Sequence, residues 1–246
     1  MHTAVHTAAR TAAGRKSQVL SPFELQALLL SLEVASRSVL LSLPFAVGAA
    51  WVLARVQFPG KLLLDGLLHL PLVLPPVVVG YLLLLAFGGR GPIGAWLDHV
   101  FGIRLAFTSA GASLATAVMT FPLMLRAIRL VIETIDSGLE QAAQTLGAGP
   151  LDRFATITLP LMLPGILSGG VVAFAASLGE FGAVITFVSN IPGETQTLPL
   201  AIYSAIQTPD GEAAAGRLAG LSLVLAFAGL LVAELAARRT RLVLGR

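Results

Sequence analysis

Residues 64–87 read LDGLLHLPLVLPPVVVGYLLLLAF, a block in which one carboxylate and one imidazole interrupt a mostly apolar run. A helix of about 20 predominantly apolar residues is long enough to cross the hydrocarbon core of a bilayer. This block is therefore predicted to span a membrane, and the rest of the chain can be interpreted from it.

The composition of the whole chain supports a membrane protein. Hydrophobic residues make up 56% of the 246 and charged residues only 12%, whereas about 25% of the residues in ordinary soluble domains are charged. Further apolar blocks predict an all-α integral membrane protein with five transmembrane helices, or six if one span escapes recognition. The predicted spans cover residues 34–54, 64–87, 105–130, 161–187 and 216–236.

Basic residues predict the orientation of these spans, because loops rich in Lys and Arg stay in the cytoplasm. If the segment after Arg129 is cytoplasmic, the external loops hold only Arg90, Arg104 and Arg217. The predicted N-terminus is then external and the C-terminus cytoplasmic, although three basic residues in the N-terminal tail oppose this orientation. The inside loops and tail hold Arg55, Lys61, Arg126, Arg129, Arg153, Arg238, Arg239, Arg241 and Arg246.

The chain divides into three parts by hydropathy. Residues 1–24 lack the apolar core of a signal peptide and are expected to form a disordered tail. Residues 25–239 form the transmembrane domain, with a polar loop at 133–160, and residues 240–246 form a cytoplasmic tail.

Several function classes find no support in the sequence. The chain has no Cys, and its four His residues do not cluster, so neither a metal site nor a cofactor is expected. It contains no nucleotide-binding loop of the G-x-x-x-x-G-K-[ST] type and no G-x-S-x-G or H-E-x-x-H motif. Basic residues are scattered, without interleaved aromatic residues, which argues against nucleic-acid binding. We therefore expect no enzyme.

Proline recurs inside the predicted spans and is paired at Pro75 and Pro76. Each proline removes a backbone hydrogen bond and bends or breaks a helix. Freed carbonyls at membrane depth need neighbouring helices or a water-lined cavity, so a broken helix can mark a pathway. Plain packing is the alternative, because proline is common in membrane helices. We favour the pathway for this pair.

The polar loop has a pattern of its own. From Ser137 to Pro160 it reads SGLEQAAQTLGAGPLDRFATITLP. Ser137 and Glu140 have the spacing of a capping box that begins a helix, and Gly147 suits its end. The apolar positions recur at i, i+3, i+4 and i+7, which predicts one apolar stripe. That stripe consists of Leu139, Ala142, Ala143 and Leu146.

Such a short helix is unstable alone in water, so the stripe must dock on something. The pattern alone leaves two readings open. The stripe contacts a separate protein, or it lies on its own protein or on lipid headgroups.

The loop resembles the EAA loop of bacterial ABC-importer permeases, which reads E-A-A, three residues, Gly, nine residues, Ile, one residue, Leu-Pro. Gln141 stands where the family has its acid, and Glu140 lies one place early, so Glu140 is expected to be a helix cap. The resemblance implies that this loop carries a coupling helix that docks on a cytoplasmic ATPase. The matching positions are Ala142, Ala143, Gly147, Ile157, Leu159 and Pro160.

Longer stretches are similar to the molybdate branch of this family, above all SLGEFGAVITFVSNIPGETQTLPLAIY from Ser177. The resemblance implies an ABC importer permease of type I in the bacterial inner membrane. It implies a homodimer with two ATPase subunits and an external molybdate-binding protein, in which ATP drives alternating access. Tungstate or sulfate permeases of the same family are the alternatives.

Glu180 lies inside the fourth predicted span, where an ionisable residue is costly and marks a functional site by default. We favour a structural role near a gate over contact with an oxyanion. Weaker candidates for a pathway are the hydroxyl and amide groups of Ser177, Thr186, Ser189 and Asn190.

Two rivals of another class remain open. An ion-gradient-driven secondary transporter would use Glu180 as a proton site. A membrane scaffold would bind a soluble partner through the polar loop and transport nothing.

Overall fold

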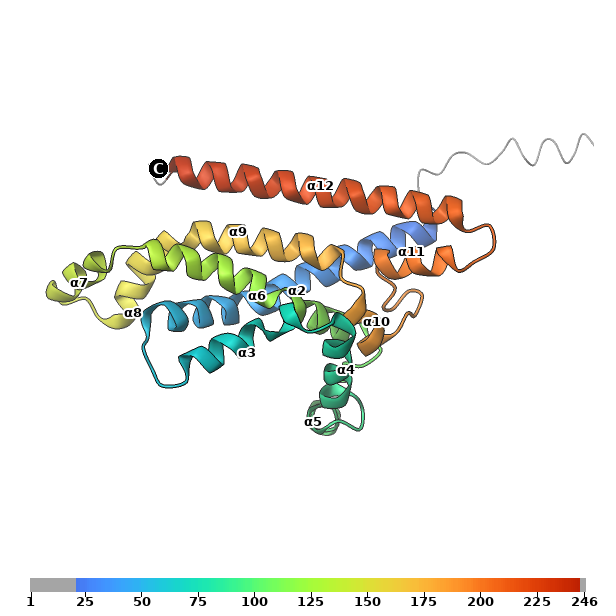
Figure 1. Cartoon of the computed structure of the whole chain (residues 1–246), viewed down its shortest axis with the longest axis horizontal. Coiled ribbons are helices and arrows are strands. Elements are labelled where there is room, and N and C mark those ends of the chain that lie inside the picture. The colour runs from blue at the N-terminus through green and yellow to red at the C-terminus, as the bar shows by residue number, and fades with distance from the viewer. Residues whose placement is uncertain (1–20, 244–246) are drawn as a thin grey trace, which may run out of the picture.

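The computed structural model describes residues 21–243, and every regular element within them is helical. Four long helices, α2 (Pro22–Arg55), α6 (Ser109–Thr134), α9 (Leu159–Leu178) and α12 (Glu212–Val243), run side by side along the long axis (Figure 1). The shorter helices are α3 (Lys61–Val73), α4 (Pro76–Phe87), α5 (Pro92–Phe101), α7 (Ser137–Thr145), α8 (Pro150–Arg153), α10 (Gly182–Val188) and α11 (Leu198–Ile206).

The long helices are the membrane spans that the sequence predicts. Four helices are long and apolar enough to cross a bilayer, and a fifth span results if α3 and α4 are counted together. Within residues 21–243 there is no sixth candidate. The first span is longer than predicted, because α2 begins at Pro22, inside the stretch expected to be a disordered tail. The rest of that tail, residues 1–20, lies outside the described residues.

The second and fourth predicted spans are interrupted. A bend of 114° separates α3 from α4 at Leu74 and Pro75, as expected from paired prolines that cannot donate backbone hydrogen bonds. The fourth span was predicted to run to residue 187, but α9 ends at Leu178 and α10 starts at Gly182. Hydropathy missed this break because it is only three residues long and two of them, Gly179 and Phe181, keep the block apolar.

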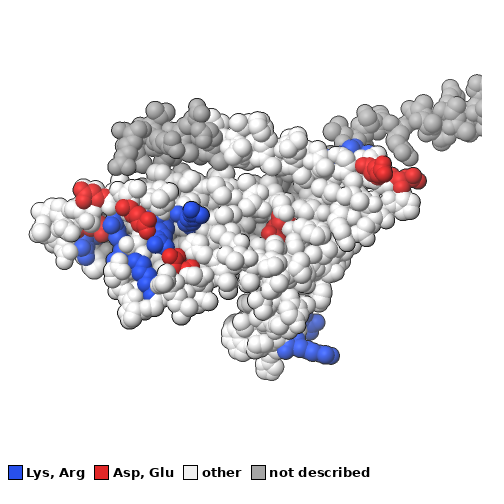
Figure 2. All heavy atoms as spheres, viewed as in Figure 1, with Lys and Arg blue, Asp and Glu red and all other residues white. Residues whose placement is uncertain are grey.

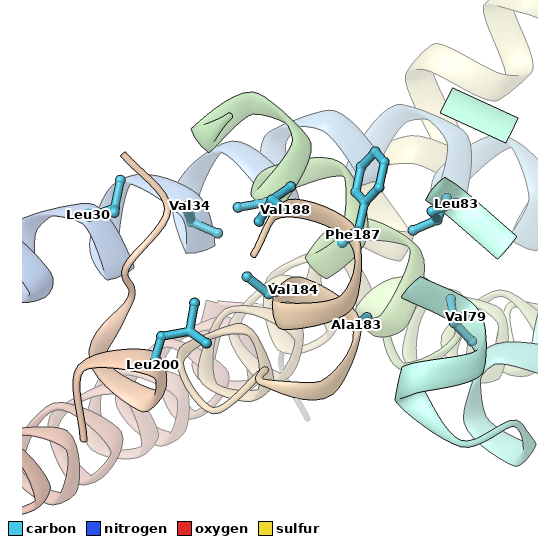
Figure 3. Close-up of a cluster of buried hydrophobic side chains, with 11 residues drawn as sticks. Leu30, Val34, Val79, Leu83, Ala183, Val184, Phe187, Val188 and Leu200 are labelled. Carbon is cyan, nitrogen blue, oxygen red and sulfur yellow. The ribbon is translucent and has the colours of Figure 1, made fainter. Parts of the chain in front are cut away.

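Two of the three buried clusters among the described residues pack around α10 and beside the polar loop. The first surrounds α10 and joins α2, α4 and α6; Figure 3 shows Val79, Leu83, Val184 and Phe187 within it. The second lies toward the end that carries α7 and includes Leu53, Met124, Ile128, Ile132 and Met162 from α2, α6 and α9. The ends of three long helices are therefore packed into one unit next to the polar loop.

Glycine sets the contact between α4 and α10. A Cβ atom added at Gly80 would lie 2.6 Å from the Ala183 carbonyl oxygen and 2.8 Å from the Thr186 Cβ. On the other side, a Cβ at Gly182 would lie 2.7 Å from the Pro76 Cβ. Small residues let helix backbones approach closely inside a membrane. Gly182 therefore allows a close approach of the two helices, whereas Gly179 makes no comparable contact.

We expect Gly80→Ala to destabilise the protein by about 1–3 kcal/mol, because a backbone oxygen cannot move aside for the new methyl group. The measurement is the thermal midpoint of unfolding of the purified protein in detergent. Gly48→Ala in α2 is the matched control, since its added Cβ meets nothing within 4 Å. Equal midpoints for the two variants would show that close packing at Gly80 does not matter.

Candidate functional site

The polar loop begins with a helix whose start differs from the prediction. Asp136 is the N-cap residue of α7, and its Oδ1 accepts a hydrogen bond of 2.8 Å from the Gly138 N–H. Ser137 is the first helical residue, so the capping box expected between Ser137 and Glu140 is wrong. Asp and Ser are about equally good N-cap residues. Because Asp136 and Ser137 are adjacent, the sequence cannot decide at which of the two the helix begins.

The end of α7 agrees with the prediction. Gly147 has a φ of 91°, a left-handed conformation that favours glycine. The Gly147 N–H donates to the Gln144 carbonyl and the Ala148 N–H to the Ala143 carbonyl, both at 3.0 Å. These two bonds form a Schellman motif, which satisfies the last carbonyls of the helix. The chain thus turns sharply after about two turns of helix.

The predicted apolar stripe is largely exposed. Leu146 is 88% exposed and Leu139 49%, while Ala142 is exposed and Ala143 half-buried. The stripe therefore does not pack on its own bundle, which leaves a separate protein or lipid headgroups as its contact. Leu151, which the sequence analysis did not single out, is 84% exposed just beyond the turn. Its apolar side chain next to Pro150 in an otherwise polar loop could have identified it as exposed.

The return from α7 to the bundle passes through an unusual element. The helix α8 leads directly into a π-helical turn, η1 (Phe154–Thr158), before α9 begins. Arg153 Nη1 donates to Gln144 Oε1 at 2.9 Å and ties α8 to α7. Of the family-matched positions here, Ile157 and Leu159 are half-buried and Pro160 is exposed near the start of α9.

Glu140 faces the bundle and does not cap its helix. Its Oε1 accepts a hydrogen bond of 2.8 Å from Thr158 Oγ1 and lies 3.5 Å from Arg55 Nη2. The neighbouring Gln141, at the family's acidic position, is exposed. Arg55 and Glu140 are far apart in the chain, so no local pattern could have shown this pair.

Charged side chains gather at the end of the bundle that carries α7 and α8, as Figure 2 shows. Arg129 lies at the centre of one group, with its Nη1 2.8 Å from Asp65 and its Nε 2.7 Å from Glu133. His69 Nδ1 is 3.1 Å from the same Asp65. The His69 contact joins residues four apart in one helix, whereas only the tertiary fold brings Arg129 of α6 beside α3.

At the break after α9, Glu180 compensates the interrupted backbone. Glu180 Oε1 accepts a hydrogen bond of 2.9 Å from the Ala183 N–H at the start of α10. A helix leaves its first N–H groups without intrahelical partners, so this half-buried carboxylate satisfies one of them. The bond is local, to a backbone group three residues later in the same chain, and the role expected for Glu180 at a gate stays a prediction.

The hydroxyl candidates are mostly engaged within the protein. Ser177 Oγ donates to the Ala173 carbonyl at 2.7 Å and lies 3.1 Å from Ser38 Oγ. Thr186 Oγ1 donates to the Gly182 carbonyl at 2.8 Å. Both hydroxyls satisfy backbone acceptors, as such groups often do in membrane helices.

The residues after α10 differ from these hydroxyls. Ser189 is exposed and has a φ of 65° with a ψ of −166°, a region that is nearly restricted to glycine. Asn190 Nδ2 donates to Ser204 Oγ at 2.7 Å, but the buried Asn190 Oδ1 has no hydrogen-bond partner in the structure. The structure brings Pro76, Glu180 and Thr186 together around the contact of α4 with α10, whereas Asn190 lies beyond it against α11.

Comparisons with known proteins give the fold and the family. A chain in the crystal structure of the bacterial alginate ABC transporter in complex with alginate pentasaccharide-bound periplasmic protein has a TM-score of 0.72. It is 19% identical, and the match covers 90% of this chain and 80% of that chain. The fold is therefore that of an ABC importer permease.

Relatives of known name are much more similar in sequence. The molybdenum transport system permease protein ModB of Escherichia coli (strain K12) is 62% identical over 93% of this chain and 100% of the relative. The ModB of Haemophilus influenzae is 56% identical over 91% and 97%. The sulfate transport system permease protein CysW of Synechocystis sp. is 38% identical over 87% and 79%.

A family model described as the binding-protein-dependent transport system inner membrane component matches residues 42–242. The match begins inside α2 and ends one residue before the end of α12, and the polar loop lies within it. The chain belongs to this family of inner membrane permease components.

Proposed function

We propose that this chain is the permease subunit of an ATP-driven importer for molybdate, with α7 as the helix that docks on a separate ATPase. The observation that carries the docking is the exposure of Leu146, which is 88%, on a helix too short to be stable alone. The substrate is inferred from the identity of 62% to the molybdenum permease of Escherichia coli.

The docking surface consists of the exposed part of the stripe with its neighbour across the turn, namely Leu139, Ala142, Leu146 and Leu151. Apolar side chains that are exposed outside the membrane-spanning helices mark a protein interface. A helix laid into a groove of its partner is a common mode of recognition. Gly147 and Pro150 keep the helix short, so the loop forms a compact protrusion at the end of the bundle.

The charged end of the bundle supports a cytoplasmic position for the polar loop. Arg55, Lys61, Arg126, Arg129 and Arg153 belong to the same end of the bundle as α7, as expected for cytoplasmic loops. The helix α12 runs toward this end and α2 begins at the other, as Figure 1 shows. The proposed topology therefore has the start of α2 outside and the end of α12 inside.

Two copies of the chain complete the proposed transporter. The helix α3 has no buried residue, and Leu62 and Val73 at its ends are 86% and 80% exposed. These apolar faces need cover from lipid or from a second copy. In the proposed homodimer the pathway runs between the copies, and the bend at Pro75 and Pro76 lies beside it. An external binding protein would deliver the anion, and two ATPase subunits would drive alternating access.

The topology is directly testable because the chain has no natural Cys. We expect Gln207→Cys, in the turn before α12, to react with a membrane-impermeant maleimide in intact cells that express this chain alone. Thr156→Cys, in η1, should react only in inverted membrane vesicles, since the proposed cytoplasmic side faces outward there. The opposite labelling pattern would overturn the topology and with it the ATPase position.

Docking is tested by a charge on the apolar surface. Leu146→Glu should reduce co-purification of the ATPase at least tenfold, because burial of a Leu side chain is worth about 1.5–3 kcal/mol, and tenfold corresponds to about 1.4 kcal/mol. ATP-dependent uptake should fall with it. Thr134→Glu adds the same charge at the end of α6, off α7, and is the control. Unchanged ATPase binding by Leu146→Glu would exclude this docking surface.

The substrate and the energy source are tested together in proteoliposomes that contain the permease, its ATPase and its binding protein. Labelled molybdate should accumulate only when ATP is supplied on the side of the membrane that carries the ATPase. Excess unlabelled tungstate or sulfate measures whether either anion competes. Sulfate as the preferred anion would assign the chain to the CysW-like branch, and uptake by the permease alone under an ion gradient would exclude the ATP-driven mechanism.

A further inference from the structure

One face of α7 carries the docking surface, and Glu140 lies on an adjacent face, about 100° around the helix from Leu139. The Glu140 side chain is 22% exposed and that of Arg55, its ion-pair partner, 18%. Thr158, which donates the hydrogen bond of 2.8 Å to the same Glu140 oxygen, is 1% exposed. Three elements therefore meet at one carboxylate oxygen: α7, η1 and the end of α2, which is distant from both in sequence.

The last turn of α2 holds the polar loop at further points. Arg55 Nη2 also donates to the Ile135 carbonyl at 3.1 Å, just before α7 begins. Trp51, one turn earlier in α2, packs edge-on against Phe154 of η1, with ring centroids 6.2 Å apart. The end of α2 thus contacts both the entry to the loop and its return.

The loop has two mechanical routes into the membrane domain. The covalent route from α7 to α9 runs through η1, a π-helical turn, an element that is rare and interrupts the regular helix. The route through Glu140 and Arg55 bypasses η1 and ends at Leu53, which is packed with Met124 and Met162 of the buried cluster. A displacement of α2 at Arg55 therefore reaches α6 and α9 through close-packed side chains.

We propose that Glu140 is a positioning residue that joins the docking helix to α2, so that movement of α7 during the ATPase cycle displaces the end of α2. This inference rests on the proposed function, since it needs an ATPase on α7. Removal of one partner from a partly buried ion pair leaves an uncompensated charge. Loss of Glu140 would accordingly separate movement of α7 from movement of the bundle while leaving the docking surface intact.

The test measures molybdate transported per ATP hydrolysed by the reconstituted complex. Glu140→Gln keeps an oxygen acceptor for Thr158 but removes the charge that faces Arg55. We expect the ATPase to co-purify as before and to hydrolyse ATP, while the transport ratio falls about fivefold or more, the lower end of typical coupling between sites. Asp152→Asn removes the same charge from the same loop, where the structure shows no ion pair, and should leave the ratio unchanged.

A charge reversal distinguishes positioning from simple loss of stability. The double variant Arg55→Glu with Glu140→Arg restores the pair with opposite polarity, so its transport ratio should exceed that of either single variant. Recovery will be partial, because the Ile135 carbonyl loses its donor. A transport ratio in Glu140→Gln equal to that of the unmodified chain would overturn the proposal, as would loss of ATPase co-purification, which would place Glu140 in docking.

These outcomes are separate from failure of the proposed function. If the unmodified chain takes up no molybdate with ATP, the transport function itself is wrong. If it does, and neither Glu140→Gln nor the charge reversal changes the ratio, only the role of Glu140 is wrong.

Discussion

The hydrocarbon core of a membrane contains no water to replace a missing backbone hydrogen bond, and this constraint governs where the chain can depart from helix. The break between α9 and α10 obeys it, because the Glu180 carboxylate accepts the Ala183 N–H that the interruption frees. At the bend after α3, Pro75 and Pro76 have no N–H to satisfy. Each interruption is thus chemically compensated by the residue type that stands there.

The helices that follow the two interruptions, α4 and α10, contact each other, and glycine makes this contact possible. Gly80 and Gly182 bring α4 and α10 so close that neither position has space for a methyl group. Phe187 and Val184 then fill the space between α4, α6 and α2 (Figure 3). Both helices that meet here are interrupted, and regions with interrupted backbone hydrogen bonding open at lower free energy than continuous helices.

Sequence reasoning succeeded where the signal was local. Apolar blocks located the spans, paired prolines predicted the bend, and Gly147 predicted the end of α7 with its left-handed conformation. It failed where two adjacent residues were equally suitable, or where the contact joined residues far apart in the chain. Asp136 and Ser137 compete for one capping position, and the pairing of Glu140 with Arg55 depends on the packing of α2 against the loop. The identity of the transported anion has no residue signature and came from resemblance.

The polar loop shows how a short helix can be held ready for a partner. A cap at Asp136, a Schellman motif at Gly147 and the contact of Glu140 with Thr158 fix the backbone and the inner face of α7. The outer face keeps Leu146 almost fully exposed. Ordering α7 in advance lowers the entropy that binding must overcome, so the partner's affinity can come from burial of a few apolar side chains. The same inner contacts that order the helix also connect it to α2. In the proposed mechanism, preorganisation of α7 and transmission of its movement therefore depend on one set of contacts.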